Sequence, residues 1–269
     1  MQVAGTRALI TGSSRGIGRG IALKLASEGV AIAVHYLQDE ASAKATAEKV
    51  RDLGAEAVVV QGDVCDPAQL LALISNAAEQ LGGLDVFVSN ARPELPAFFQ
   101  PPLELTAEAW DAAMNSQARA FLLGAREAAS RMSDGGRILA VTYATGSVTG
   151  GLQPWVAMGA AKAAMEALVR YLAVTFAPRG ITVNALSPAW TEDSVLNTLP
   201  VEAQDLIRGW HQRGWTPMGR LTTPADVGDA AALLLSVEAG FITGQTLRVD
   251  GGASLMNAEV PSELQLPAR

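Results

Sequence analysis

The chain alternates short apolar runs with longer segments of helical periodicity along most of its length. The apolar runs have the length of strands and are Arg7–Ile10, Ala31–His35, Ala57–Gln61, Val86–Ser89, Arg137–Thr142, Thr182–Leu186 and Thr246–Val249. The segments between them are long enough for crossover helices and are Gly18–Glu28, Glu40–Leu53, Pro67–Leu81, Glu108–Met132, Val156–Phe176 and Pro224–Leu235. Because parallel strands need such crossovers, the alternation predicts an α/β fold with a doubly wound parallel sheet of about seven strands and helices on both faces.

Length and pattern together predict one domain. The chain has 269 residues, which is enough for one large core but too short for two full catalytic domains. We expect the domain to span residues 1–256. Within it, the segment Thr191–Arg220 has little strand pattern, which predicts an irregular lid segment, residues 191–220, over a pocket. Residues 257–269 are expected to form a loosely structured C-terminal tail.

Composition argues against several classes of function. A net charge of −7 without a Lys/Arg cluster argues against nucleic acid as a partner, because binding to the phosphate backbone depends on neutralising cations. Charges or glycines interrupt the apolar stretches before the roughly 20 residues that a membrane span requires. One cysteine and two distant histidines provide no metal-ligand cluster. A lone cysteine forms no internal disulfide and no charged-then-apolar leader opens the chain, so we expect a cytoplasmic protein.

A glycine-rich turn follows the first expected strand. Its sequence is Thr11-Gly12-Ser13-Ser14-Arg15-Gly16-Ile17-Gly18, and a helical segment comes directly after it. Glycines at this spacing let the backbone turn tightly and approach a pyrophosphate, whose charge the helix N-terminus stabilises. A glycine-rich helix start without a ligand has the same local pattern, so the turn alone leaves both interpretations open.

Further motifs strengthen the interpretation as a nucleotide-binding turn. They are Asp63-Val64 after the third strand, Asn90-Ala91 after the fourth, Lys162 in a long helical segment, the run from Val183 to Pro188 and the run from Gly244 to Gly252. Together with the turn, they make the chain resemble the short-chain dehydrogenase/reductase family from Gly5 to Leu255. The resemblance implies a Rossmann-type fold. It also implies a nicotinamide dinucleotide held by Gly12, Ser14, Arg15, Gly16, Ile17, Gly18, Asp63, Val64, Asn90, Ala91, Lys162 and Pro188.

Two residues favour NADPH over NADH. The second strand ends at His35, where proteins that bind the NAD ribose are expected to have a carboxylate. Arg15 instead offers a guanidinium suited to a 2′-phosphate. In the family that the chain resembles, a basic residue in this turn usually accompanies NADP. We therefore expect NADPH as the cofactor; an exposed Arg15 that serves only solubility is the alternative.

The expected reaction centre departs from the family pattern. The family usually combines Asn, Ser, Tyr and Lys, with the Tyr four residues before the Lys. Lys162 matches, but Met158 occupies that Tyr position. Trp155 lies seven residues before Lys162, where a bacterial enoyl-acyl-carrier-protein reductase branch has its Tyr. Neither a thioether nor an indole N–H is a usable acid near neutral pH, so the proton donor is not at either usual position.

Tyr143 and Gln117 stand where the family has its Ser and Asn, and Asn115 is a second amide nearby. Two interpretations follow: the redox site has decayed, or the proton donor has moved. The segment from Tyr143 to Ser147 is similar to the site of 2,4-dienoyl-CoA reductases, whose catalytic Tyr lies at the end of this strand. Tyr143 lies nineteen residues before Lys162, a few more than in that branch, so we expect the intervening loop to absorb an insertion.

Few other side chains compete for the role of acid. The chain has three Tyr, two His and one Cys. Tyr36 follows the second strand near the expected adenosine half of the cofactor, Tyr171 lies in mid-helix and His211 lies in the lid. Tyr143 is therefore the candidate at the sheet edge that faces the cofactor. An aromatic ring packed on the core with its hydroxyl in solvent would give the same pattern.

A relocated Tyr suits the reduction of an α,β-unsaturated acyl thioester, on CoA or on a carrier protein. Hydride transfer to the β-carbon leaves negative charge on the thioester oxygen, which needs hydrogen-bond donors. We expect Tyr143 and Gln117 to supply them, Lys162 to hold the nicotinamide ribose, and Tyr143 or a water to protonate the α-carbon. The expected substrate pocket is lined by Trp155, Met158 and Trp190.

Two alternatives to enoyl reduction stay open. One is a carbonyl reductase or alcohol dehydrogenase of the same family, in which Tyr143 replaces the usual Tyr. The other is a protein that keeps NADP without redox chemistry, as a sensor, a cyclase or an isomerase. In each case we expect a homo-oligomer, a dimer or a tetramer, because the long apolar segments Glu108–Met132 and Val156–Phe176 exceed what one sheet face covers.

Overall fold

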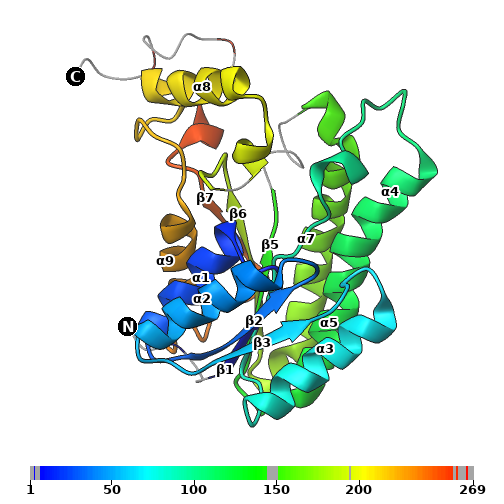
Figure 1. The fold of residues 1–269 in the computed structure, drawn as a ribbon, viewed down its shortest axis with the longest axis vertical. Helices are drawn as coiled ribbons and strands as arrows, with labels where there is room; N and C mark the ends of the chain where they lie inside the picture. Colours follow the sequence, from blue (N-terminus) through cyan, green and yellow to red (C-terminus); the bar gives the residue numbers. More distant parts are fainter. Residues whose placement is uncertain are drawn as a thin grey trace.

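A seven-stranded parallel sheet lies at the centre of the described part of the chain (Figure 1). The computed structural model describes residue 3, residues 7–143, 151–193 and 195–256, and residues 259 and 265. The strands are β1 (Arg7–Ile10), β2 (Ala31–Tyr36), β3 (Ala57–Gln61), β4 (Val86–Ser89), β5 (Arg137–Val141), β6 (Thr182–Pro188) and β7 (Thr246–Val249). Their order is β3-β2-β1-β4-β5-β6-β7, with every neighbouring pair parallel. The prediction of a doubly wound parallel sheet is confirmed.

Helices cover both faces of this sheet (Figure 1). They are α1 (Gly16–Ser27), α2 (Glu40–Asp52), α3 (Pro67–Gln80), α4 (Ala107–Met114), α5 (Ala120–Arg131), α7 (Val156–Phe176), α8 (Val201–Trp210) and α9 (Pro224–Leu234). Helices α1, α2 and α9 pack on one face, and α3, α5 and α7 pack on the other. This arrangement leaves the carboxyl edge of the sheet open, where ligands bind in doubly wound folds.

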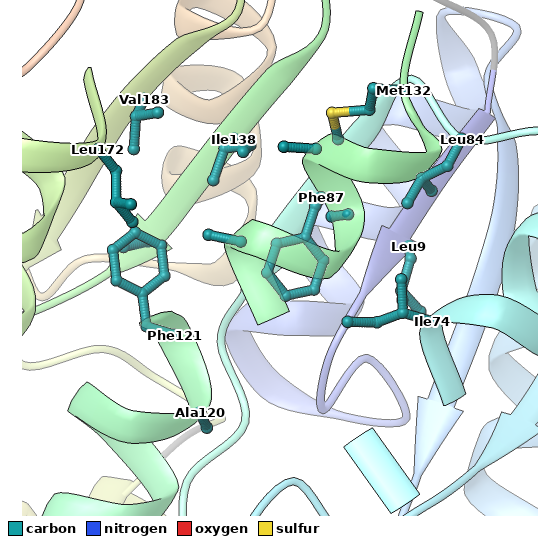
Figure 2. Packing of buried hydrophobic residues seen from close by; sticks show 14 of the residues in the cluster. Leu9, Ile74, Leu84, Phe87, Ala120, Phe121, Met132, Ile138, Leu172 and Val183 are labelled. Carbon is teal, nitrogen blue, oxygen red and sulfur yellow. The ribbon is translucent and has the colours of Figure 1, made fainter. Parts of the chain in front are cut away.

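Side chains along a strand alternate between the two faces, as the pleat requires. In β1, Leu9 belongs to the core beneath α3, α5 and α7, whereas Ala8 and Ile10 belong to the opposite core. Phe87 lies at the centre of the first core (Figure 2). Its ring covers Gly124 of α5, where a Cβ would lie 2.8 Å from the ring Cζ. The close approach explains a glycine inside a helix, a position that otherwise costs about 1 kcal/mol relative to alanine.

The helical segment expected at Glu108–Met132 contains a π-helical turn. Helix α4 ends at Met114, the π turn spans Asn115–Arg119, and α5 follows it directly. A π turn adds a residue to the helical repeat and therefore changes where the following side chains point. In this turn Ser116 and Gln117 are buried, and Gln117 contacts the loop after β4.

The lid segment Thr191–Arg220 is more regular than the sequence predicts. The expectation of an irregular segment is wrong, because the segment contains α8 and a π-helical turn at His211–Trp215. Helix α8 lies at the end of the molecule beyond the sheet edge (Figure 1). None of its residues is buried, although its sequence is amphipathic. Arg208 of α8 binds the carboxylate of Glu192 through Nε at 3.0 Å and Nη2 at 2.9 Å, which ties the helix to the start of the lid.

No helix among the described residues is long and apolar enough to cross a membrane. No group of three or more His, Cys, Asp or Glu side chains in that part of the chain is arranged to hold a metal ion. Most of the expected tail, residues 257–269, lies outside the described residues.

Candidate active site

A cleft lies at the carboxyl edge of the sheet, where the loops after β1 to β6 meet. It encloses about 760 Å³. Most of the expected site residues line it: Gly12, Ser14, Arg15, Gly16, Ile17, Asp63, Val64, Asn90, Ala91, Tyr143, Trp155, Met158, Lys162, Pro188 and Trp190. Gly18 and Gln117 are not among the lining residues. The structure therefore brings residues from distant parts of the sequence together in one cleft, with two of the expected residues behind its wall.

The glycine-rich turn between β1 and α1 favours glycine at two positions because of its backbone angles and at a third because of lack of space. Gly12 has φ +68° and Gly16 has φ +56°, in the left-handed region that favours glycine. A Cβ on Gly18 would lie 2.4 Å from the Gly12 carbonyl oxygen and 2.6 Å from Asn90 Nδ2. Asn90 Nδ2 donates to the carbonyls of Thr11 at 2.9 Å and Gly12 at 3.2 Å. The turn is thus held open towards the cleft, as pyrophosphate binding requires.

His35 braces this turn from the end of β2, a role that the sequence did not predict. Its Nδ1 accepts the N–H of Gly12 at 2.8 Å, and its Nε2 donates to the carbonyl of Gly62 at 2.9 Å. Because one partner only donates and the other only accepts, the ring is the neutral Nε2–H tautomer. Burial also lowers the pKa of His35, which favours the neutral form. His35 therefore joins the glycine-rich turn to the end of β3.

Arg15 and Asp63 lie on the part of the cleft formed by the loops after β1 and β3. The Arg15 side chain is 62% exposed and pairs with Glu94. An exposed pair of this kind contributes little stability, so the guanidinium is free to bind a phosphate instead. Asp63 accepts the backbone N–H of Cys65 at 2.8 Å. Burial, followed by the charge of Asp63, raises the pKa of the Cys65 thiol to about 11, which makes it a poor nucleophile.

Lys162 of α7 is held firmly at the other end of the cleft. Its Nζ donates to Gln117 Oε1 at 2.6 Å and to the Val141 carbonyl at 2.5 Å. Burial, and then the charge of Arg92, lowers the pKa of Lys162 to about 7, against an opposing effect of Glu166. An ammonium has three donors, so one N–H is left for a ligand.

Both ends of the Gln117 carboxamide have protein partners. Its Oε1 accepts from Lys162, and its Nε2 donates to the Ala91 carbonyl and to Ser116 Oγ, both at 3.1 Å. Gln117 is buried. This geometry differs from the direct contact with substrate that the sequence led us to expect. Asn115, the second candidate amide, is not among the lining residues either.

Tyr143 follows β5 and belongs to an aromatic wall of the cleft. Its ring meets Trp155 edge-on, with centroids 6.0 Å apart. Trp155 makes similar edge contacts with Phe98 at 5.2 Å and Phe99 at 5.9 Å. Burial raises the pKa of Tyr143, so the phenol keeps its proton at neutral pH. Residues 144–150, which include Ser147, lie outside the described residues.

The lid forms the remaining wall. Its residues at the cleft are Thr191, Asp193, Val195, Leu196, Asn197 and Thr198. Asp193 pairs with Arg19 of α1, which links the lid to the helix that follows the glycine-rich turn. His211 lies away from the cleft, with its Nδ1 at hydrogen-bond distance, 2.5 Å, from Thr216 Oγ1. The structure therefore gives His211 a local partner within the lid.

Arg92 is a cleft residue that sequence reasoning missed. It comes directly after Asn90-Ala91 and lines the cleft. Burial lowers its pKa, and the nearby Glu94 opposes this effect. The signal that could have identified it is an arginine directly after the Asn90-Ala91 motif, which follows the buried strand β4.

The glycine-rich turn before α1 and the open carboxyl edge above it are features of a dinucleotide-binding protein of the doubly wound α/β class, and Tyr143 and Lys162 line the same cleft. A family model described as enoyl-(acyl carrier protein) reductase matches residues 12–254. The chain belongs to the short-chain dehydrogenase/reductase family.

Three similar proteins illustrate the range of that family. The chain is 39% identical to 1-cyclohexenylcarbonyl-CoA reductase of Streptomyces collinus, over 97% of this chain and 92% of the relative. The angucycline C-6 ketoreductase LanV, solved with bound NADP, has a TM-score of 0.84 and 32% identity, over 95% of this chain and 98% of the other. A short-chain dehydrogenase of Burkholderia cenocepacia, solved in complex with NADP, has a TM-score of 0.83 and 31% identity, over 94% and 99%.

Proposed function

We propose that the protein reduces the C=C bond of an α,β-unsaturated acyl thioester, on CoA or on a carrier protein, with NADPH. The observation that carries the proposal is the arrangement of Tyr143 and Lys162. Both line the cleft, and Lys162 donates to the carbonyl of Val141, two residues before Tyr143. Met158 occupies the usual Tyr position and is buried. The family model and the cyclohexenylcarbonyl-CoA relative support an enoyl thioester as the substrate.

The cleft fits NADPH as the cofactor. The glycine-rich turn has the tight shape of a pyrophosphate-binding loop, since Gly12 and Gly16 have positive φ and a Cβ on Gly18 would lie 2.4 Å from the Gly12 carbonyl oxygen. Arg15 would bind the 2′-phosphate and Lys162 the nicotinamide ribose. NADP in two structural neighbours agrees with this cofactor. The remaining residues that would hold it are Gly12, Ser14, Gly16, Ile17, Asp63, Val64, Asn90, Ala91 and Pro188. NADPH, when bound, supplies a hydride.

The protein's own groups then manage the charge and the proton. Tyr143 donates a hydrogen bond to the substrate, and it or a water gives a proton to the α-carbon after the β-carbon is reduced. Gln117 acts through Lys162: its Oε1 fixes Nζ, so we replace its expected contact with substrate by a positioning role. Trp155, Met158 and Trp190 exclude water around the acyl group.

Turnover of a panel of enoyl thioesters tests the proposal. Purified protein, NADPH and enoyl-CoAs that include 1-cyclohexenylcarbonyl-CoA should show loss of NADPH absorbance and formation of the saturated acyl-CoA. Tyr143→Phe should lower kcat by about 100-fold, the usual effect of removing one donor at a developing oxyanion. Tyr171→Phe is the matched control, because Tyr171 is 75% exposed. Absence of NADPH oxidation with every thioester would contradict the proposal.

Ketone reduction is the second candidate, favoured by the similarity to LanV, a ketoreductase. The same Tyr143 would protonate an alkoxide oxygen instead of a carbon. Ketones turned over with higher kcat/KM than enoyl thioesters would establish it. Tight NADPH binding without oxidation by either class would instead indicate a sensor, a cyclase or an isomerase.

The exposed apolar face of α7 supports self-association. Tyr171 is 75% and Val174 78% exposed on this helix, and exposed apolar patches mark interfaces. We propose a dimer or tetramer. Light scattering after size-exclusion chromatography measures the mass directly, and Val174→Glu should lower it.

A further inference from the structure

Arg92 is a cation in the cleft whose guanidinium is only partly used by the protein. Its Nη1 donates to the Pro93 carbonyl at 2.8 Å, and none of the ion pairs within the described residues includes it. The carboxylates that line the cleft have other partners. Asp39 accepts from Ser42, Asp63 from Cys65, Glu94 from Arg15 and Asp193 from Arg19. Arg92 therefore has N–H donors for a ligand.

Arg92 and Tyr143 lie in the loops that follow two neighbouring strands. Ser89, the last residue of β4, pairs with Ala140 of β5, and Arg92 and Tyr143 each come three residues after a member of this pair. Both residues line the cleft.

A chain of hydrogen bonds joins the loop that carries Arg92 to Lys162. The carbonyl of Ala91, next to Arg92, accepts from Gln117 Nε2, and Gln117 Oε1 accepts from Lys162 Nζ. The charge of Arg92 contributes to the lowered pKa of Lys162, which agrees with this proximity. Arg92, Lys162 and Tyr143 thus form one group of donors from three elements of the fold.

Arg92 and Lys162 are neighbouring cations in a partly desolvated cleft, so this part of the cleft favours the binding of an anion. Like charges repel, and burial makes each charge costly unless a negative group compensates it. Glu94 and Glu166 compensate these charges only in part, because the pKa values of Arg92 and Lys162 both stay lowered. In the proposed reaction, negative charge develops on the thioester oxygen. A guanidinium is suited to that oxygen because it offers several donors and never loses its proton in this pH range.

We infer that Arg92 is a catalytic residue that donates hydrogen bonds to the thioester oxygen while it becomes an enolate oxygen. This inference rests on the proposed function. A hydride supplied by NADPH forms the new C–H bond at the β-carbon, the C=C electron pair moves towards the carbonyl, and NADP⁺ remains. Arg92 keeps its protons throughout. The α-carbon then takes its proton from Tyr143 or a water, so Arg92 shares the stabilisation of the enolate oxygen with Tyr143 but takes no part in proton donation.

Kinetics of Arg92 variants test the inference. Arg92→Gln should lower kcat by about 100-fold at saturating NADPH, as the loss of an oxyanion donor does. Arg92→Lys should recover part of this loss, because it keeps the charge without the planar fork. Arg126→Gln, an exposed arginine of α5 away from the cleft, is the matched control. The Kd of NADPH, measured by fluorescence without substrate, should stay within about twofold, since the lost contact is to the substrate.

The outcomes separate this inference from the proposed function. An active wild type with unchanged kcat in Arg92→Gln would overturn the inference alone. A raised Kd of NADPH with normal kcat at saturation would also overturn it and assign Arg92 to a cofactor phosphate. A wild type that reduces no enoyl thioester would overturn the proposed function, and the inference with it. If Arg92→Gln does not melt cooperatively, Arg92→Met, which also removes the charge and the donors, is judged by the same criteria.

Discussion

The two ends of the cleft differ in whether backbone groups or side chains form their surface. At the turn end, backbone groups and glycines define the surface: Asn90 and His35 hold the turn, and Gly18 has no room for a Cβ. At the reaction end, side chains define it, and Lys162 and Tyr143 project from separate elements. Backbone geometry permits few changes, whereas a donor can move to another strand end if it reaches the same space. An altered reaction-centre motif therefore does not by itself mean that the chemistry is lost.

The largest effect is expected where the backbone leaves no room. Gly18→Ala places a Cβ 2.4 Å from the Gly12 carbonyl oxygen and 2.6 Å from Asn90 Nδ2, so the turn must shift. We expect NADPH affinity to fall by roughly 100-fold, because the shifted turn no longer has the shape that the pyrophosphate needs. Titration of NADPH fluorescence measures this loss.

The control for this substitution is Gly209→Ala in α8. Its added Cβ would meet only Arg213 Nη1, at 3.6 Å, within the described residues. Equal losses of affinity in both variants would show that a general loss of stability, and not the packing of the turn, is responsible.

A slightly smaller effect is expected at Lys162, at the reaction end of the cleft. Lys162→Met removes the donor and the charge, and kcat should fall by up to about 100-fold. Because the cation holds the ribose, wild-type kcat/KM should fall as the pH rises through the Lys162 pKa of about 7. Arg92→Gln should move this midpoint upward, since the Arg92 charge lowers that pKa.

NMR of ¹³C-labelled lysine side chains in the protein without ligands measures the Lys162 titration directly, and Lys162→Met assigns its signal. Lys24 serves as the internal control, because its pKa is raised by hydrogen bonding to Glu28. A Lys162 signal that titrates with that of Lys24 would contradict a desolvated lysine at the reaction end.

The turn end of the site was predictable because its shape is specified by residues that are close together in the sequence. The spacing of Gly12, Gly16 and Gly18 directly after a strand specifies a backbone shape, and the structure has that shape. The strands and most helices were predictable for the same reason, since each depends on the periodicity of one segment. Helix α8 was not predicted, although its sequence is amphipathic, because it is a helix of ten residues between Pro200 and a π-helical turn and buries none of its side chains.

The reaction end depends on contacts between segments far apart in the chain. Gln117 lies in the π turn and from there contacts Lys162 and Ala91, and the apolar pattern of the sequence does not predict that turn. His35 was recognised as a missing carboxylate, but its bridge between Gly12 and Gly62 requires the end of β2 to meet the loops after β1 and β3. Arg92 gains a role only beside Lys162. Such roles come from the fold, and the sequence alone does not show them.

His35 tests the turn end by a milder change. His35→Leu leaves the Gly12 N–H and the Gly62 carbonyl without their partner, at about 1–3 kcal/mol for each unsatisfied group. NADPH affinity should fall by roughly tenfold, because the turn is less well ordered before binding. Urea unfolding and NADPH titration measure the two effects.

The pH dependence of unfolding gives His35 a second test. Burial puts the folded pKa below the unfolded value of 6.5, so the unfolded chain binds more protons between these values. The contribution of His35 to stability is complete above pH 6.5 and is lost as the pH falls through the folded pKa. His35→Leu should flatten this part of the curve, whereas an unchanged slope would assign it to other groups.

The smallest effect is expected at Arg15, where the turn end depends on an exposed side chain. Arg15→Gln should weaken NADPH binding by about fivefold and leave NADH binding unchanged, because an exposed charged contact contributes on the order of 1 kcal/mol. The Arg15 pair with Glu94 is itself 62% and 63% exposed, so its loss should not destabilise the fold. Added salt should weaken NADPH binding in the wild type more than in Arg15→Gln. Equal weakening of NADPH and NADH would show that Arg15 contacts a group common to both, and the preference for NADPH would then have to come from another residue.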